Sequence, residues 1–148
     1  MPRQERNRAP ERVALLLAGL LLAAVGCDRG PKLVPIQGRV LYRGQPLPFG
    51  SVMFQPAGGL PARGTIGTDG TFRLTTHSAG DGVLPGQSRV RVTCYEHQRP
   101  GTSTSAQQQE VGLGRLLIPK RYTSFGTSGL KIEVRADRAE PVTIELHD

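Results

Sequence analysis

The chain has 148 residues, a length that favours one domain, and its 19 glycines, 12 prolines and few aromatic residues favour turns and short strands over long helices. Its two cysteines, Cys27 and Cys94, are too few for a disulfide framework. The formal net charge of +7 is not read as a nucleic-acid signal, because part of it lies in an N-terminal segment that is expected to be removed.

The N-terminal segment has the pattern of a secretory signal peptide. Residues 1–12 are polar and basic, and the thirteen residues Val13–Val25 carry no charge. This apolar run is shorter than the roughly 20 residues that a membrane-spanning helix needs. A basic head, a short apolar core and small residues before a break predict a signal peptide over residues 1–26. The alternative is a buried helix of the fold, which the flanking residues disfavour.

Cys27 stands where the apolar run ends and polar residues begin. The small residues Ala24, Val25 and Gly26 before it resemble a bacterial lipobox, in which the cysteine thiol receives a diacylglycerol and the cysteine becomes the new N-terminus. Ala24 replaces the usual leucine of that motif, which leaves ordinary secretion as the alternative. The resemblance implies that Cys27 is a lipid attachment site, and two or three acyl chains there would hold the protein on a membrane.

Cleavage before Cys27 also changes the charge of the protein. It removes four arginines and two glutamates and leaves 15 basic and 10 acidic residues, a net charge of +5. Residues 27–33 form a short tether, of which the six residues after Cys27 reach at most about 20 Å. The domain is therefore expected to lie close to the bilayer. A basic surface there would contact anionic lipid or wall polymer, and the simpler alternative is a solvated surface with a modest positive excess.

From Val34 onward, apolar and polar residues alternate, which is the pattern of strands with one buried face. The segments that show it are Val34–Tyr42, Gly50–Pro56, Thr71–Thr75, Ser88–Glu96, Leu130–Arg135 and Pro141–His147, with Arg63–Thr68 as a weaker seventh. Asp69-Gly70, between two of these segments, predicts a hairpin turn. Because no amphipathic helical stretch occurs, residues 34–148 predict an all-β domain, an antiparallel β-sandwich of about seven strands.

Cys94 shares one face of its predicted strand with Val90 and Val92, while Arg89 and Arg91 take the opposite face. We therefore expect Cys94 to be buried as a small hydrophobic residue of low reactivity. The alternative is a register slip of one residue, which would expose Cys94 and allow it to link two chains. The slip would also bury two arginines without partners, so burial of Cys94 is favoured.

Several motifs follow one another in an order that resembles carboxypeptidase regulatory-like domains, also called transthyretin-like or prealbumin-type domains, as found in small bacterial lipoproteins. They are Ile36–Phe54 (IQGRVLYRGQPLPFGSVMF), Gly67–Thr76 (GTDGTFRLTT), Gly80–Thr93 (GDGVLPGQSRVRVT) and Ile118–Val134 (IPKRYTSFGTSGLKIEV). The resemblance covers nearly all of the mature chain and rests on turn glycines and strand faces. It implies a prealbumin-like or immunoglobulin-like sandwich in an envelope protein, and it assigns no activity, because function lies in sites and not in folds.

The residues that carry chemistry are sparse and scattered. His77, His97 and His147 lie far apart in the sequence, and neither H-E-x-x-H nor C-x-x-C occurs, so we expect no metal and no cofactor. The stretch GTSGL lacks the G-x-S-x-G pattern of a serine nucleophile. The protein is therefore expected not to be an enzyme, and a hydrolase is the least favoured class.

One segment breaks the alternation. Residues 96–117 are rich in serine, threonine, glutamine and glycine and predict a mobile loop, with a recognition loop at the end of the sandwich as the alternative. A set of basic and aromatic side chains follows, which we take as candidate contacts for a glycan or polymer: Lys120, Arg121, Tyr122 and Phe125. The alternative for the two aromatic residues is that they cap the core.

Together, these patterns predict a lipid-anchored protein of the bacterial cell envelope whose domain lies outside the cytoplasm. Its expected partners are the membrane, through the anchor, and an envelope protein or glycan, without nucleic acid. A structural or protein-binding module is favoured, and a carbohydrate-binding module is the alternative. An exposed aromatic platform would favour the glycan, and a bare edge strand would favour a protein partner.

Overall fold

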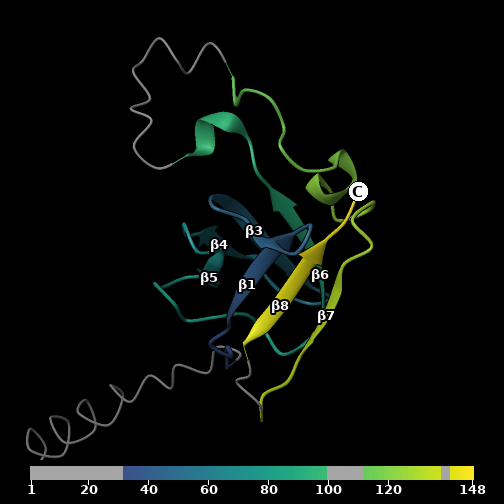
Figure 1. The fold of residues 1–148 in the computed structure, drawn as a ribbon. Helices are drawn as coiled ribbons and strands as arrows, with labels where there is room; N and C mark the ends of the chain where they lie inside the picture. Colours follow the sequence, from purple (N-terminus) through teal and green to yellow (C-terminus); the bar gives the residue numbers. More distant parts are fainter. Residues whose placement is uncertain (1–31, 100–111, 138–140) are drawn as a thin grey trace, which may run out of the picture. The chain divides into compact units, whose positions relative to one another are not determined.

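The computed structural model describes residues 32–99, 112–137 and 141–148, which belong to one compact unit, Lys32–Asp148 (Figure 1). These residues contain eight strands and no α-helix. The strands are β1 Gln37–Tyr42, β2 Gln45–Pro46, β3 Gly50–Pro56, β4 Ala62–Ile66, β5 Thr71–Arg73, β6 Gly86–Thr93, β7 Lys131–Val134 and β8 Val142–Leu146, with short 3-10 helices η2 Glu96–Gln98 and η4 Lys120–Thr123. The predicted all-β domain is confirmed. The predicted signal peptide and Cys27 lie outside the described residues.

The strands form two sheets. One sheet runs in the order β4-β3-β6-β7, with every pair antiparallel. In the other, β1 pairs with β5 and β2 in antiparallel fashion and with β8 in parallel fashion. Strand β8 pairs along most of one edge of β1. Strands β5 and β2 must therefore share the opposite edge of β1. The sandwich is therefore mostly antiparallel, as predicted, with the parallel pair β1 and β8 as the exception among the described strands.

The core lies between the sheets and follows the predicted alternation. Every second residue of the longer strands is buried, among them Val40, Phe54, Val90 and Ile144, which are at most 2% exposed. Cys94 is 1% exposed, which confirms its predicted burial. The outward residues of the same strands are mainly polar, as expected for a sheet with one wet face.

One side of the sandwich is closed and the other is open. Arg63 on β4 and Thr75 after β5 exchange two backbone hydrogen bonds of 2.8 and 2.9 Å, which join the two sheets. On the opposite side, β7 and β8 each pair with only one strand among the described residues. Figure 1 shows these two strands together, away from β4 and β5.

The predicted loop 96–117 begins and ends in backbone pairing. Glu96 N–H donates to the carbonyl of Arg115 (3.1 Å), and Leu117 N–H donates to that of Cys94 (2.8 Å). The sequence did not predict this pairing, because the loop carries no alternation there. Residues 100–111 lie outside the described residues, so mobility there stays a prediction. No helix in the described part of the chain has the length and hydropathy needed to cross a membrane.

Candidate functional site

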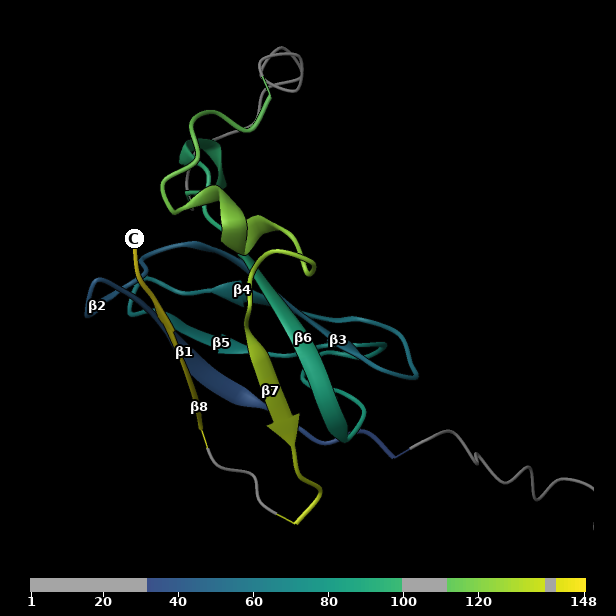
Figure 2. The same ribbon diagram turned by 90° about the vertical axis from the view of Figure 1, so that its right-hand side faces the viewer.

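The residues predicted as a contact surface lie on η4 and just after it, over the end of β6 (Figure 2). Tyr122 is only 5% exposed, so its ring belongs to the core. Its hydroxyl oxygen accepts hydrogen bonds from the Arg121 guanidinium and the His147 backbone N–H, both at 3.0 Å. Arg121 also donates to the His147 carbonyl (2.6 Å). Tyr122 and Arg121 therefore hold η4 to the end of β8.

Phe125 also turns toward the protein. The Arg91 guanidinium carbon lies 5.3 Å from the centre of the Phe125 ring, and Arg91 donates to the Thr123 carbonyl (3.3 Å). Phe125 is half-buried and Lys120 is exposed. The four predicted residues thus lie on or next to η4, but neither aromatic ring among them is exposed. The alternative for Tyr122, that it caps the core, is the one observed.

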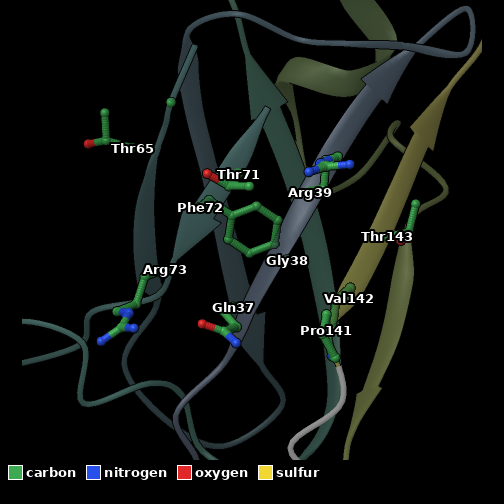
Figure 3. Close-up of a pocket in the computed structure, with 11 residues that line it drawn as sticks. Gln37, Gly38, Arg39, Thr65, Thr71, Phe72, Arg73, Pro141, Val142 and Thr143 are labelled. Atoms are coloured by element: carbon green, nitrogen blue, oxygen red, sulfur yellow. The ribbon is translucent and has the colours of Figure 1, made fainter. Parts of the chain in front are cut away.

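A hollow of about 640 Å³ lies on the outer face of the sheet formed by β5, β1 and β8 (Figure 3). Its polar lining consists of two guanidinium groups, one amide and three hydroxyls, from Arg39, Arg73, Gln37, Thr65, Thr71 and Thr143. The remaining lining comes from Gly38, Gly67, Phe72, Pro141 and Val142. Its volume falls within the range of about 300–1,000 Å³ typical of small-molecule sites.

Strand register explains why these side chains meet. Gln37 lies directly opposite Arg73, and Arg39 lies between Thr71 on one side and Thr143 on the other. Outward residues of neighbouring strands share one face, so Arg39 and Arg73 are diagonal neighbours, a relationship that places side chains about 7–8 Å apart. The sequence identified each arginine as a wet-face residue. It did not reveal that β1 and β5 are neighbours in this register.

Arg73 also lines two further hollows. One, of about 560 Å³, includes Arg63, Thr65 and Thr75, and the other, of about 200 Å³, includes Pro35 and Gln37. We call Arg39, Arg63 and Arg73 the arginine face, because they line hollows that share Arg73 as a common lining residue. No aspartate or glutamate lines any of these three hollows.

The arginine face lacks counter-ions within the described residues. The ion pairs among the described residues join Arg43 to Asp148, Arg115 to Glu96, and Arg135 to Asp137. None of them includes a residue of the arginine face. Arg39 helps to lower the pKa of Asp69, but it is the smallest of several causes. The largest cause is the Thr71 hydroxyl, which donates to Asp69 at 2.6 Å.

Two other carboxylates are occupied by local hydrogen bonds. Asp81 accepts from the backbone N–H groups of Ser78, Thr76 and His77 at 2.7–2.8 Å, and these bonds lower its pKa. The Arg43 guanidinium, followed by the Tyr42 hydroxyl, lowers the pKa of Asp148. Both carboxylates thus have hydrogen-bond partners other than the arginine face, although the turn of Asp81 lies against Arg73.

The other residues named from the sequence lie apart. His77, His97 and His147 are exposed on separate segments, and the described residues hold no group of three His, Cys, Asp or Glu side chains that could bind a metal ion. Cys94 is a free thiol, and burial raises its pKa to about 11, although the positive charge of Arg99 slightly opposes this.

Together, the described residues define a two-sheet, mostly antiparallel β-sandwich with a cationic series of hollows on its surface. Scans of the sequence against protein-family models, curated proteins and solved structures found no match.

Proposed function

We propose that this protein is a lipid-anchored component of the bacterial cell envelope, with a non-catalytic sandwich outside the cytoplasm that binds a protein partner or serves a structural role. Two features support the anchor: the signal-like residues 1–26 and the lipobox-like residues before Cys27. The sandwich supports it further, since its first backbone bridge, Val34 to Val83, begins seven residues after Cys27.

We further propose that the fold is of the carboxypeptidase regulatory-like, or transthyretin-like, type. The turns that carry this resemblance lie between strands, as the motifs require. Arg43-Gly44 connects β1 to β2, and Asp69-Gly70 lies between β4 and β5. Arg43, Gly44 and Gly70 have positive φ angles, a backbone conformation that favours glycine and occurs in tight turns.

The observation that carries the protein-binding role is the open edge of β8. This strand has β1 as its single neighbour among the described residues, so half of its backbone donors and acceptors face away from the sheet. Its outward side chains, Thr143 and Glu145, include no lysine or arginine, whereas β7 carries Lys131 at the other open edge. Charged lysine is a common guard against strand addition. An extended segment of a partner would therefore add to β8.

The aromatic residues favour a protein partner over a glycan. All seven tyrosine and phenylalanine side chains lie in the described part of the chain, and each is buried or half-buried. Sugar rings stack on exposed aromatic rings, and this sandwich offers no such platform. Carbohydrate binding is therefore not proposed as the main role.

Anchoring is tested by fractionation of cells that express the full chain. Cys27→Ser is expected to move the protein from the membrane fraction to the soluble fraction and to leave the signal peptide uncleaved. Cys94→Ser is the matched control and is expected to leave partitioning unchanged. Unchanged membrane partitioning of Cys27→Ser would overturn the anchoring proposal.

The role of β8 is tested by photo-crosslinking in cells. A photoreactive residue replaces Glu145 on β8 or, as a control, Gln87 on the interior strand β6; both positions are exposed. We expect a discrete adduct from position 145 alone, identified by mass spectrometry. Equal adducts from both positions, or none from position 145, would contradict strand addition.

A further inference from the structure

We propose that the arginine face, formed by Arg39, Arg63 and Arg73, is a second membrane contact that binds the phosphate headgroups of anionic phospholipids in the bilayer that holds the anchor. This inference rests on the proposed lipidation of Cys27 for its location, and on the described residues for its chemistry.

The first argument is chemical. All three cations are arginines, and a guanidinium group presents its donors in a planar fork that binds two oxygens of one phosphate. Gln37 and Thr143 add an amide and a hydroxyl around the same hollow, whereas the Thr71 hydroxyl already donates to Asp69. An anion that enters it meets donors from three strands and no carboxylate.

The second argument is electrostatic. Arg39, Arg63 and Arg73 are exposed and lie more than 4.0 Å from every described carboxylate. Two acidic residues lie near Arg39, namely Glu145, diagonal to it on β8, and Asp69, whose pKa Arg39 helps to lower, and neither lines the hollows. Like charges gathered without counter-ions repel one another, so a bound anion relieves that repulsion while it gains hydrogen bonds.

The third argument concerns how Arg73 is held at the centre of the face. A side chain on Gly80 would place its Cβ 2.8 Å from Cδ of Arg73, so the arginine stem lies directly against this glycine. Gly80 belongs to a turn that the Asp81 carboxylate ties together through three backbone N–H groups. The turn therefore supports the Arg73 side chain from one side.

The fourth argument is position, and it favours a lipid headgroup over a soluble anion. Pro35, Ile36 and Gln37, at the start of the described chain, line one of the hollows together with Arg73. The five residue steps from Cys27 to Lys32 span at most about 18 Å. An acylated Cys27 would therefore limit how far this end of the sandwich can lie from the bilayer, and attraction to the bilayer becomes strong once a charge comes within about 8–10 Å of it.

The test uses the mature chain, residues 27–148 with Cys27→Ser, so that no acyl chain contributes. Its binding is measured by co-sedimentation with vesicles of phosphatidylcholine alone and with vesicles that contain 30% phosphatidylglycerol, at low and high salt. The variant Arg39→Gln/Arg63→Gln/Arg73→Gln is compared with Arg115→Gln/Lys120→Gln/Arg135→Gln, which removes the same charge from exposed residues elsewhere. Thermal melting of both variants checks that the sandwich stays folded.

We expect binding to the anionic vesicles that high salt weakens. The loss should be roughly fivefold for each arginine, or about 100-fold for the triple variant of the arginine face. The control variant should lose much less. Equal losses would show that net charge alone attracts the chain, and would overturn the proposal. So would absence of binding by the parent chain, or tighter binding to the soluble polyanion alginate than to vesicles of equal charge.

The result of the vesicle-binding test can be distinguished from that of the fractionation test of the anchor. Vesicle binding by the unacylated chain does not depend on modification of Cys27. If fractionation shows no lipidation but the arginine face still binds anionic vesicles, the anchor proposal fails and the contact stands. If Cys27 is lipidated but the two triple variants bind alike, the contact fails and the anchor stands.

Discussion

Gly38 lies directly opposite Phe72 in the pairing of β1 with β5, and the Phe72 ring covers the position that a side chain on residue 38 would occupy. A Cβ on Gly38 would lie 2.8 Å from Cζ of Phe72 and would also collide with the Val142 carbonyl oxygen of β8. Glycine at this position thus lets an aromatic ring and two strands approach β1 at one point. Gly38 and Phe72 also line the 640 Å³ hollow.

Gly38→Ala is expected to lower the free energy of unfolding by about 2 kcal/mol, the usual cost of overpacking a dense core. Urea unfolding measures the effect. Gly58→Ala is the matched control, since a Cβ there meets no atom within 4 Å and the backbone is not left-handed, so its stability should be nearly unchanged. Equal stability of the two variants would contradict the close packing at Gly38.

Cys94 should resist thiol reagents in the native protein. Its side chain is 1% exposed, and burial raises its pKa to about 11, so little reactive thiolate forms at pH 8. In a Cys27→Ser background, labelling should be slow without denaturant and fast in guanidinium. The folded pKa lies above the ordinary value of 9.0, so this group's contribution to stability is complete below pH 9 and is lost as the pH rises toward 11. Rapid native labelling would refute the burial.

Tyr122→Phe removes the hydroxyl that joins Arg121 to the backbone of His147. Since the lost bonds lie at a buried side chain, we expect a decrease of about 1 kcal/mol in the free energy of unfolding. Tyr42→Phe serves as the comparison, because its hydroxyl donates to Asp148 at an exposed position and should contribute less. A larger decrease in the free energy of unfolding for Tyr42→Phe than for Tyr122→Phe would contradict a stabilising role of the Tyr122 hydroxyl.

The stability of the protein should fall at acidic pH partly through Asp81. Three backbone N–H groups lower its pKa from 3.8, so the stabilising contribution is complete above pH 4 and is lost as the pH falls through the lowered value. Asp81→Asn should therefore weaken the protein at pH 6 and flatten the pH dependence below 4, as measured by urea midpoints. Asp137→Asn, at a side chain 74% exposed, should leave the curve unchanged. Parallel curves for parent and Asp81→Asn would contradict this role.

Deletion of residues 102–109 should leave the melting temperature within a few degrees of that of the parent chain. Closure entropy changes slowly with loop length, and the two stems are held by backbone bonds of Glu96 to Arg115 and of Leu117 to Cys94. Scanning calorimetry gives the comparison. Loss of cooperative unfolding would show that these residues are part of the folded unit.

The sequence by itself determined which residues face the core, as Val90, Val92 and Cys94 show. Side-chain direction in a strand is a local property with a period of two, so alternation alone identifies it. The weakest predicted strand, Arg63–Thr68, also exists, as β4 Ala62–Ile66. Burial of Tyr122 was left open, because a short 3-10 turn has no repeating pattern that distinguishes core from surface.

Tertiary structure alone decided which strands became neighbours. The parallel pairing of β1 with β8 joins the two ends of the domain, so no turn between them signals its direction. The meeting of Arg39, Arg63 and Arg73 likewise depends on the register of β1 with β5 and on the closure of β4 against β5. Such pairings are set by how all the buried faces pack at once. For that reason Arg39 and Arg73 could be read from the sequence as outward residues, but the arginine face could not.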